Sequence, residues 1–400
     1  MNSLAAHYAT LILREQGERL RALRTAGWER LQQVSLHAID LSEEVPPTTH
    51  TYDLRPWILP EAVHSFLVFV NGRLRLDLSD CTALQGQIVI QEFAEATRSF
   101  GGIITQQVQT HLKESAPDDN ILLNLALHEQ GVFLYLLPHH TVSSVLQCIQ
   151  IVDSFAQEGR IFPRIHLVVG TGSTLTFHLS NVAFTSNPTL HTHGVVDIVL
   201  DSASCLTSYH RRAHEMGTCT DSLRVRQKQD SQWKAFFYDA IPCHSSLNIR
   251  STLQGVGATV ELFGLAQLRQ QAHLQQRIVV EHAAAHTTSL QTFRAVLKDR
   301  AFARFASTVY MLPGADKGVA RQAHHSLLLS PEAHAESAPH LEIGTTDVKA
   351  GHGATMTRPN PQQMFYLATR GIPPEQANAL LVDGFCHLIR QESPHPHFLQ

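Results

Sequence analysis

The sequence predicts a mainly β protein with helical regions at both ends. Short runs rich in Val, Ile, Leu and Phe recur between about residues 121 and 350, with no long helical pattern between them. Toward both ends, apolar residues instead follow the period of an amphipathic helix. Of the 400 residues, 43% are hydrophobic and 16% are charged, against about 25% charged in an average soluble domain. The chain therefore has the composition of a packed protein rather than a disordered one.

The charge balance and the short apolar stretches exclude two broad classes of partner. Lys and Arg number 31 and Asp and Glu number 35, so the formal net charge of -4 offers no bulk attraction for nucleic acid or an anionic membrane. The longest apolar stretches, Phe66–Val70 and Val132–Leu137, are far shorter than the roughly 20 residues that cross a bilayer. The first residues carry no basic leader or cleavage site. We therefore expect a cytoplasmic protein that binds neither nucleic acid nor membrane.

Residues 1–120 are predicted to form a mixed helical region with a small hairpin. Apolar positions up to about residue 34 follow a helical period, and two consecutive prolines then break the pattern. Farther along, Asn71-Gly72 separates the apolar run Phe66–Val70 from the alternating run Arg73–Leu76, which is the pattern of a tight β-hairpin. A polar, turn-forming cluster at Ser115–Asn120 marks a boundary or the start of a helix.

Residues 121–355 are predicted to form the β core. Seven short β-rich runs are visible: Val132–Leu136, Ile165–Val169, Leu175–Leu179, Val195–Leu200, Leu223–Val225, Leu247–Ile249 and Val260–Leu262. They recur without long helices between them and, at most junctions, without hairpin turns. Such spacing suits either a solenoid of short strands or a β-sandwich, and no strict sequence repeat decides between the two.

Residues 356–400 are predicted to form a C-terminal helical region. Asn360 is a favourable N-cap ahead of Pro361, and Arg370-Gly371 supplies a stop, so we expect a helix over residues 361–369. A second helix begins near Pro374. Its apolar residues form a stripe that must be buried against the chain's own body or against a partner: Ala377, Leu380, Leu381, Phe385, Leu388 and Ile389.

The chain lacks the motifs of several common catalytic sites. It contains no G-x-x-x-x-G-K-[ST] phosphate loop, no G-x-G-x-x-G opening a helix, no H-E-x-x-H pair and no G-x-S-x-G elbow. Its six cysteines are scattered without a C-x-x-C spacing, which is typical of isolated thiols rather than of a metal cage or a disulfide framework.

Two residue pairs leave narrower possibilities open. Asp197 and Asp201 fall on the same face of one predicted strand, so a stand-alone β-solenoid enzyme acting on carbohydrate is an alternative. Acids that flank a strand are more commonly its solvated ends. His191 and His193 likewise share a strand face, and they suit a metal only if a third ligand comes from elsewhere.

The most informative segment runs from Leu341 to Thr355 and continues at Gln363–Ile372. It resembles the C-terminal signature of the SufB and SufD family of iron-sulfur cluster assembly proteins. The similarity covers most of the chain. It extends outward through Leu327–Ser330, Pro339 and Ala377–Phe385. Weaker similarity is found at Ser289–Asp299, Leu123–Ala126 and Val70–Gly72.

Single residues indicate which branch of that family the chain is similar to. The SufB branch carries His-Glu-Ala and usually an N-terminal cysteine cluster, whereas this chain has His352-Gly353-Ala354 and no such cluster. It therefore looks like the SufD branch. It departs from many SufD sequences at Ala350, where they have Cys, so no thiolate acts at that position.

The resemblance implies a right-handed parallel β-helix flanked by N-terminal and C-terminal helical regions. It also implies a non-catalytic scaffold subunit that pairs with a SufB-like subunit and holds a SufC-like ATPase through its C-terminal helices. The ATPase partner would hydrolyse ATP, and the resulting motion would expose a cluster-building site at the interface of SufB and SufD. Two alternatives remain: a homodimeric scaffold that works without SufB, and the stand-alone carbohydrate-active β-helix enzyme.

The resemblance also assigns site residues to this chain. His352 is the candidate ligand for a transient iron-sulfur cluster shared with SufB, because a neutral imidazole is a borderline-soft ligand for iron. Neither a catalytic residue nor a cofactor held by this chain alone is expected. The residues expected to face the ATPase are Met364, Phe365, Tyr366, Leu380, Leu381 and Phe385.

Overall fold

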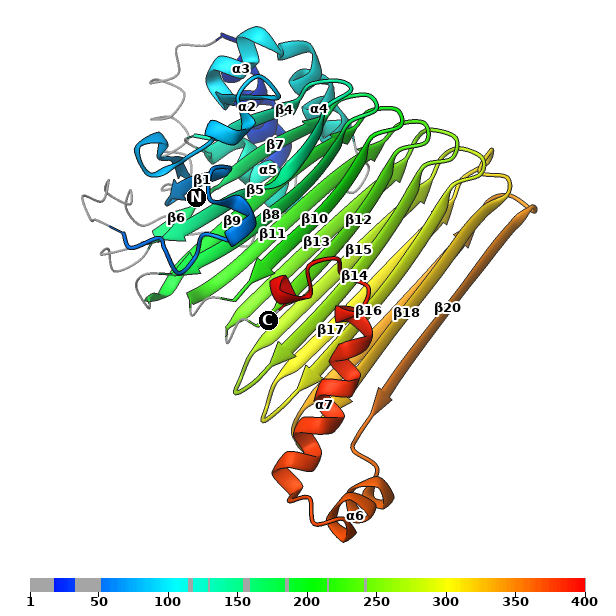
Figure 1. The fold of residues 1–400 in the computed structure, drawn as a ribbon. Helices are drawn as coiled ribbons and strands as arrows, with labels where there is room; N and C mark the ends of the chain where they lie inside the picture. The colour runs from blue at the N-terminus through cyan, green and yellow to red at the C-terminus, as the bar shows by residue number, and fades with distance from the viewer. Residues whose placement is uncertain are drawn as a thin grey trace. The chain divides into compact units, whose positions relative to one another are not determined.

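Strands make up most of the regular secondary structure in the described chain, and helices are concentrated toward its two ends (Figure 1). In this computed structural model the described residues are 18–32, 52–113, 118–128, 130–153, 159–183, 187–213, 216–240 and 243–399. The helix predicted near the start of the chain is present as α2 (Glu18–Gln32). The rest of that predicted helix lies outside the described residues.

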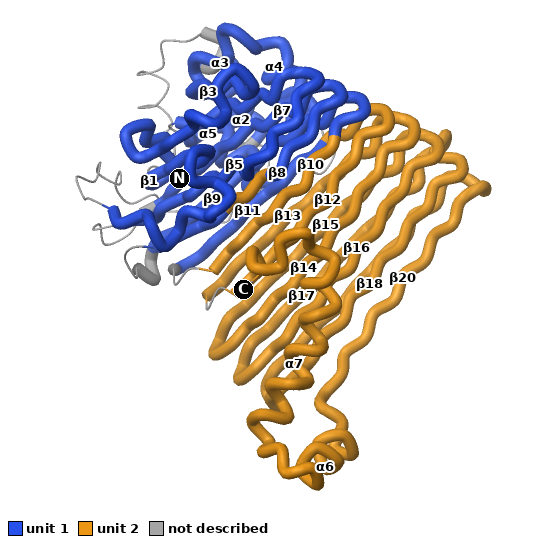
Figure 2. Tube along the Cα trace, viewed as in Figure 1, with its two compact units in different colours: residues 1–176, 180–204, 215–225 blue, residues 177–179, 205–214, 226–400 orange. Residues whose placement is uncertain are grey.

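Two compact units divide the chain, and Figure 2 distinguishes them by colour. Unit 1 comprises residues 1–176, 180–204 and 215–225, and unit 2 comprises residues 177–179, 205–214 and 226–400. Unit 1 holds the N-terminal helices and the small hairpin. Unit 2 holds His352 and the C-terminal helices.

The hairpin of unit 1 forms where the sequence predicts it. Strands β1 (Phe66–Val70) and β2 (Arg73–Leu74) pair antiparallel, and Asn71 and Gly72 make the turn with φ of 50° and 80°. Both angles lie in the left-handed region that a tight hairpin turn requires, so the hairpin prediction is confirmed. The polar cluster before residue 120 starts a helix, because the Asp118 carboxylate accepts a hydrogen bond from the Asn120 N–H at the start of α5 (Asp119–Leu127).

The remaining strands of unit 1 form parts of two sheets. One sheet has the order β2-β1-β5-β8 and the other β3-β4-β7-β9-β11, with β6 paired to β9. Their bounds are β3 (Ile88–Glu92), β4 (Val132–Leu136), β5 (Thr141–Val152), β6 (Gly159–Ile161), β7 (Arg164–Val169), β8 (Thr174–Ala183), β9 (Asn187–Leu200) and β11 (Met216–Gln227). The helices and 3-10 turns are α3 (Phe93–Ser99), α4 (Gly101–Lys113), η1 (Pro60–Ala62), η2 (Leu76–Leu78) and η3 (Thr82–Leu84).

Unit 2 is a parallel β-helix in which the chain alternates between two sheets. One sheet contains, in order, β10 (Cys205–Arg212), β12 (Gln232–Asp239), β14 (Thr259–Leu268), β16 (Thr288–Leu297), β18 (Gly318–Leu328) and β20 (Val348–Thr357). The other contains β13 (His244–Leu253), β15 (His273–His282), β17 (Phe302–Met311) and β19 (His334–Ile343). Neighbouring strands in both sheets pair in parallel. The parallel β-helix is thereby confirmed over the sandwich, whose sheets are antiparallel.

Successive turns of unit 2 stack in register. His244 pairs with His273, and His273 pairs with Phe302, so equivalent positions lie 29 residues apart. Within β13, buried and less buried side chains alternate along the strand. The turns share a pattern of burial rather than a set of identical residues, which explains why no strict repeat is visible in the sequence.

The C-terminal helices are α6 (Pro361–Thr369) and α7 (Pro374–Arg390), followed by η4 (Pro396–Leu399). The Asn360 side chain accepts a hydrogen bond from the Gln362 N–H at 2.8 Å, which confirms the predicted N-cap. Figure 1 shows α7 lying along the sheet that contains β14 and β16, and contacts with both strands agree. Among the described residues, no helix combines the length and apolarity needed to cross a bilayer.

The apolar stripe of α7 is only partly buried against the chain's own body, so the partner alternative stays open for its exposed residues. Ala377 and Ile389 are buried, but Leu380 and Leu388 are 56% and 43% exposed. Cys386, which the predicted stripe omits, is fully buried. The apolar arc is wider than the face of the helix that one flat sheet covers, so its outer members remain exposed.

Candidate functional site

The candidate site lies at the end of the β-helix, where both sheets finish. Strands β19 and β20 each stand at the edge of their sheet, with no further strand beyond them in the described chain. Nearly all of β20 is exposed, whereas its neighbour β18 alternates between buried and exposed residues. The interior of the β-helix is therefore open at this end.

His352 occupies an interior position of this uncovered last turn. It pairs with Gln322 of β18, which in turn pairs with Gln291 of β16. Gln322 and Gln291 are buried at 3% and 0% exposure. Because side chains in register point the same way in a parallel sheet, His352 continues a column that is interior in the two preceding turns.

The layer beneath His352 is polar and hydrogen-bonded. The Gln322 Nε2 donates to the Ser307 Oγ at 2.7 Å, and that hydroxyl donates to the Gln291 Oε1 at 2.6 Å. The Gln322 Oε1 is buried and has no hydrogen-bond partner in the described chain. An unpaired buried carbonyl is costly, and this unused acceptor belongs to the residue that pairs with His352 on the neighbouring strand. Sequence reasoning missed Gln322, although strand alternation from Ala320 would have marked it as interior.

The residues that flank His352 are small. Gly351 and Gly353 both have open space where a Cβ would stand, and neither has a positive φ. This chain's own packing therefore does not require glycine at either place. Ala350 is half-buried and pairs with Ala320, so the side chain next to the histidine offers no ligand atom.

The structure separates the residues that the sequence assigned to the ATPase-facing surface. Phe365, Tyr366 and Leu380 are exposed, at 73%, 56% and 56%. Phe385 instead packs beneath Arg294, whose guanidinium carbon lies 4.7 Å from the ring centroid and whose Nη1 donates to the Phe385 carbonyl. The two others, Met364 and Leu381, are half-buried. Phe365, Tyr366 and Leu380 thus offer the most exposed apolar surface of the six.

The acid pair is not an enzymatic site. Asp197 is fully buried in unit 1, where its carboxylate accepts from the His111 Nε2 and from the Arg164 Nη2, both at 2.7 Å. Burial alone raises the pKa of Asp197, but His111 and Arg164 outweigh it and hold that pKa well below the usual range. Asp201 follows the end of β9 and is half-buried. The expectation of solvated strand ends is therefore wrong for Asp197, and Asp197 and Asp201 do not form an exposed pair of the kind that sugar cleavage requires.

The histidine pair on β9 is also engaged within the chain. The His193 Nδ1 lies 2.9 Å from the Asn120 Oδ1, and its ring stacks on Phe162 with centroids 5.4 Å apart. Burial lowers the pKa of His193 to about 3. The described residues group no third metal-binding side chain with His191 and His193.

Comparison with known proteins identifies the family. The sequence matches the family model described as "SUF system FeS cluster assembly, SufBD core domain" over residues 152–385. It is 24% identical over 391 residues to an iron-sulfur cluster assembly SufBD family protein of Synechocystis, covering 94% of this chain and 84% of that protein. It is 25% identical over 330 residues to the iron-sulfur cluster assembly protein SufD of Escherichia coli, covering 80% of this chain and 73% of that protein. For SufD of Bacillus subtilis the identity is 25% over 277 residues, with 68% of this chain and 62% of that protein covered. The match over most of the β-helix and the parallel fold itself agree: the chain belongs to the SufBD family of SUF-system iron-sulfur cluster assembly proteins.

Proposed function

We propose that this chain is a SufD-like scaffold subunit for iron-sulfur cluster assembly. It pairs with a SufB-like subunit through the open end formed by β19 and β20, and it docks a SufC-like ATPase through α6 and α7. ATP hydrolysis by that ATPase drives the motion that exposes a cluster-building site at the paired ends. His352 supplies one ligand to the transient cluster, which is the cargo of the complex rather than a resident cofactor.

The open end of the β-helix is the observation that carries this proposal. Strand edges and apolar side chains that stay uncovered attract a partner chain, and this end exposes Ile343 of β19 and Met356 of β20, the strand that carries His352. A partner that continues the two sheets would bury the interior column on which His352 stands. Because one imidazole cannot hold a cluster alone, that partner must supply the remaining ligands.

The polar layer below His352 supports its role as a ligand. If one ring nitrogen donates its proton to the unpartnered Gln322 Oε1, the other nitrogen keeps a lone pair directed out of this chain. Metal-binding histidines are commonly held by such a hydrogen bond from the second nitrogen. Gln322 is thus suited to fix the ring and its tautomer.

The exposed apolar residues of the C-terminal helices support the ATPase contact. No residue of α6 is buried, and Phe365 and Tyr366 project large apolar rings from it. On α7, Leu380 is exposed on the side away from Ile389, which packs on the sheet. Apolar surface of this kind is typical of a helix that a partner covers.

Co-expression tests the proposal directly. A tagged copy of this chain would be produced with the SufB and SufC of the same organism, and the purified assembly would be weighed by native mass spectrometry. We expect one complex that contains this chain, SufB and a pair of SufC subunits. A monomer that ignores both partners would refute the proposal. A homodimer that excludes SufB would support the alternative of a scaffold working without it.

A further inference from the structure

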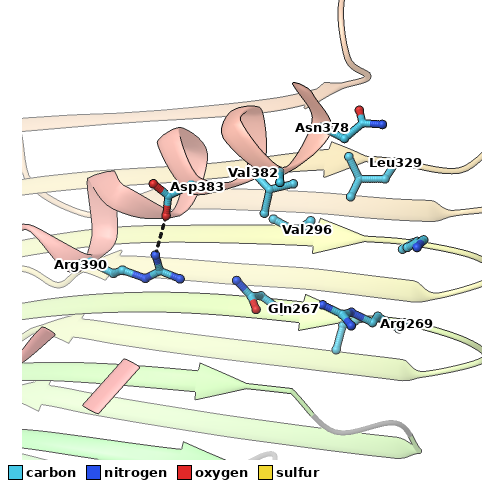
Figure 3. Close-up of a pocket in the computed structure, with 11 residues that line it drawn as sticks. Gln267, Arg269, Val296, Leu329, Asn378, Val382, Asp383 and Arg390 are labelled. Atoms are coloured by element: carbon cyan, nitrogen blue, oxygen red, sulfur yellow. Dashed lines mark hydrogen bonds and ion pairs between the residues drawn. The ribbon is translucent and has the colours of Figure 1, made fainter. Parts of the chain in front are cut away.

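A cavity of about 420 Å³ lies under α7, against the carboxyl ends of β14, β16 and β18 (Figure 3). This volume is within the range of small-molecule sites. Side chains from the sheet and from the helix line it together: Gln267, Leu268, Arg269, Val296, Lys298, Leu329, Asn378, Ala379, Val382, Asp383 and Arg390.

The rim of this cavity is cationic. Arg269, Lys298 and Arg390 line it against a single carboxylate, that of Asp383. Asp383 is already paired, because its Oδ1 accepts from the Arg390 Nη1 at 2.9 Å. In the part of the chain that the structure describes, no ion pair or side-chain hydrogen bond engages Arg269 or Lys298. The positive charges of Arg269 and Lys298 therefore have no counter-charge among the described residues at the opening of the cavity.

The middle of the cavity is apolar. Figure 3 shows Val296 on the sheet facing Val382 on the helix, with Leu329 beside them. The buried Arg390 Nε has no hydrogen-bond partner in the described chain, so one further donor is unused at the cavity wall. An apolar middle with unused cationic donors at its edge fits a ligand that has an apolar body and an anionic group.

We propose that this cavity binds a small organic anion, with its carboxylate or phosphate on Arg269 and Lys298 and its apolar body between Val296 and Val382. The proposal goes beyond the scaffold function and does not rest on it. Because α7 forms one wall, a bound anion links the helix to the sheet and stabilises the packing of α7 on that sheet. The carboxylate and phosphate forms share the same recognition, and the probes below separate them.

Isothermal titration calorimetry on the full chain tests the proposal with four probes. Phenyl phosphate and benzoate carry both an apolar ring and an anion, inorganic phosphate lacks the ring, and phenol lacks the anion. We expect phenyl phosphate or benzoate to bind with a dissociation constant of about 1 mM or tighter, and the two truncated probes about tenfold more weakly. Whichever aromatic anion binds more tightly identifies the anionic group. If inorganic phosphate bound as tightly as phenyl phosphate, the assigned contact with the ring would be wrong. If phenol bound as tightly as the aromatic anions, the assigned contact with the anion would be wrong. If no probe bound, the site itself would be refuted.

Point variants locate the binding. Arg269→Gln and Lys298→Gln each remove one unpaired charge from an exposed side chain, and each is expected to weaken binding about fivefold or more. Ala379→Phe fills the cavity without changing charge and should abolish binding. Arg321→Gln is the matched control, because Arg321 is exposed on β18 and does not line the cavity. Binding that survives all three cavity variants, or that falls equally in Arg321→Gln, would overturn the site; unchanged melting temperatures would show that the variants fold.

Discussion

His352 lies in register with Gln322, and the Gln322 side-chain carbonyl is buried with no hydrogen-bond partner in the described chain. In each earlier turn the equivalent interior position is covered by the next strand, but the last turn ends with His352 exposed. An imidazole and an unused acceptor thus lie on adjacent strands at the open end of the β-helix. This relationship links the fold to the proposed cluster chemistry, since the glutamine is suited to fix the ring that we propose as an iron ligand.

Replacing His352 tests the ligand role. In His352→Ala we expect the complex with SufB and SufC to assemble as before, while the iron and sulfide recovered per complex fall several-fold. The control is His325→Ala, because His325 faces outward on β18 and bonds Thr355 rather than the interior column. An unchanged cluster yield in His352→Ala would contradict the ligand assignment.

Gln322→Met separates the positioning role of Gln322 from a structural one. Methionine fills a similar volume and removes a buried carbonyl whose unpaired state costs about 1–3 kcal/mol. It also removes the hydrogen bond from Gln322 to the Ser307 hydroxyl, worth about 1 kcal/mol, so the isolated chain should unfold at about the same denaturant concentration. Cluster yield in the complex should nevertheless fall, because the ring loses its acceptor. Measuring both on the same preparation is decisive: a yield equal to that of the unaltered chain would show that Gln322 does not act on His352.

Asp197→Asn is expected to destabilise unit 1 strongly. The substitution leaves the buried Arg164 guanidinium without its charge partner, and breaking a buried pair in this way costs about 3–5 kcal/mol. Urea unfolding followed by fluorescence measures the change in free energy of unfolding. Asp77→Asn serves as control, since Asp77 pairs with Arg75 in an exposed position and should change stability little. A small change in the free energy of unfolding of Asp197→Asn would mean that the charge of Asp197 contributes little to the stability of unit 1.

His178→Phe is expected to make the chain less sensitive to acid. Burial, aided by the nearby Arg211, lowers the pKa of His178 to about 3, and neither ring nitrogen has a hydrogen-bond partner in the described chain. In the unfolded chain that pKa is about 6.5, so the unfolded state binds the extra proton between these values and folding weakens as the pH falls below about 6.5.

Phenylalanine cannot be protonated, and it fits between Tyr209 and Phe398, which already contact the His178 ring. The variant should therefore gain about 2 kcal/mol relative to the unaltered chain on going from neutral pH to about pH 5. Denaturant titrations at both pH values provide the measurement. Parallel pH profiles for the two proteins would show that His178 titrates normally in the folded state.

The two faces of α7 are expected to respond differently to a charge. Leu380→Asp places the carboxylate on the exposed face, so the chain should fold as before but lose SufC in a pull-down assay. Ile389→Asp buries a charge against the sheet and should weaken the packing of α7 on the sheet by about 3 kcal/mol or more. Val256→Asp controls for a new charge at an exposed apolar residue elsewhere. Retention of SufC by Leu380→Asp would place the ATPase contact elsewhere.

Local features of this protein could be read from the sequence. The Asn71-Gly72 turn, the Asn360 cap and the strand runs depend on neighbours within a few residues, and all are found where the sequence predicts them. The family signature around His352 also indicates the parallel β-helix. These features are local because turn geometry, capping and burial alternation are set by short-range sterics and hydrogen bonds.

Other features were decided only by the tertiary structure. Gln322 meets His352 across 30 residues of chain, and Asp197 meets His111 across 86, so no local pattern reports either contact. The sequence showed that the α7 stripe is apolar, but the single sheet beneath it determined that Ile389 is buried and Leu380 is exposed. Register between turns and the coverage of a helix face are set by packing of distant segments, which the order of residues along the chain does not by itself reveal.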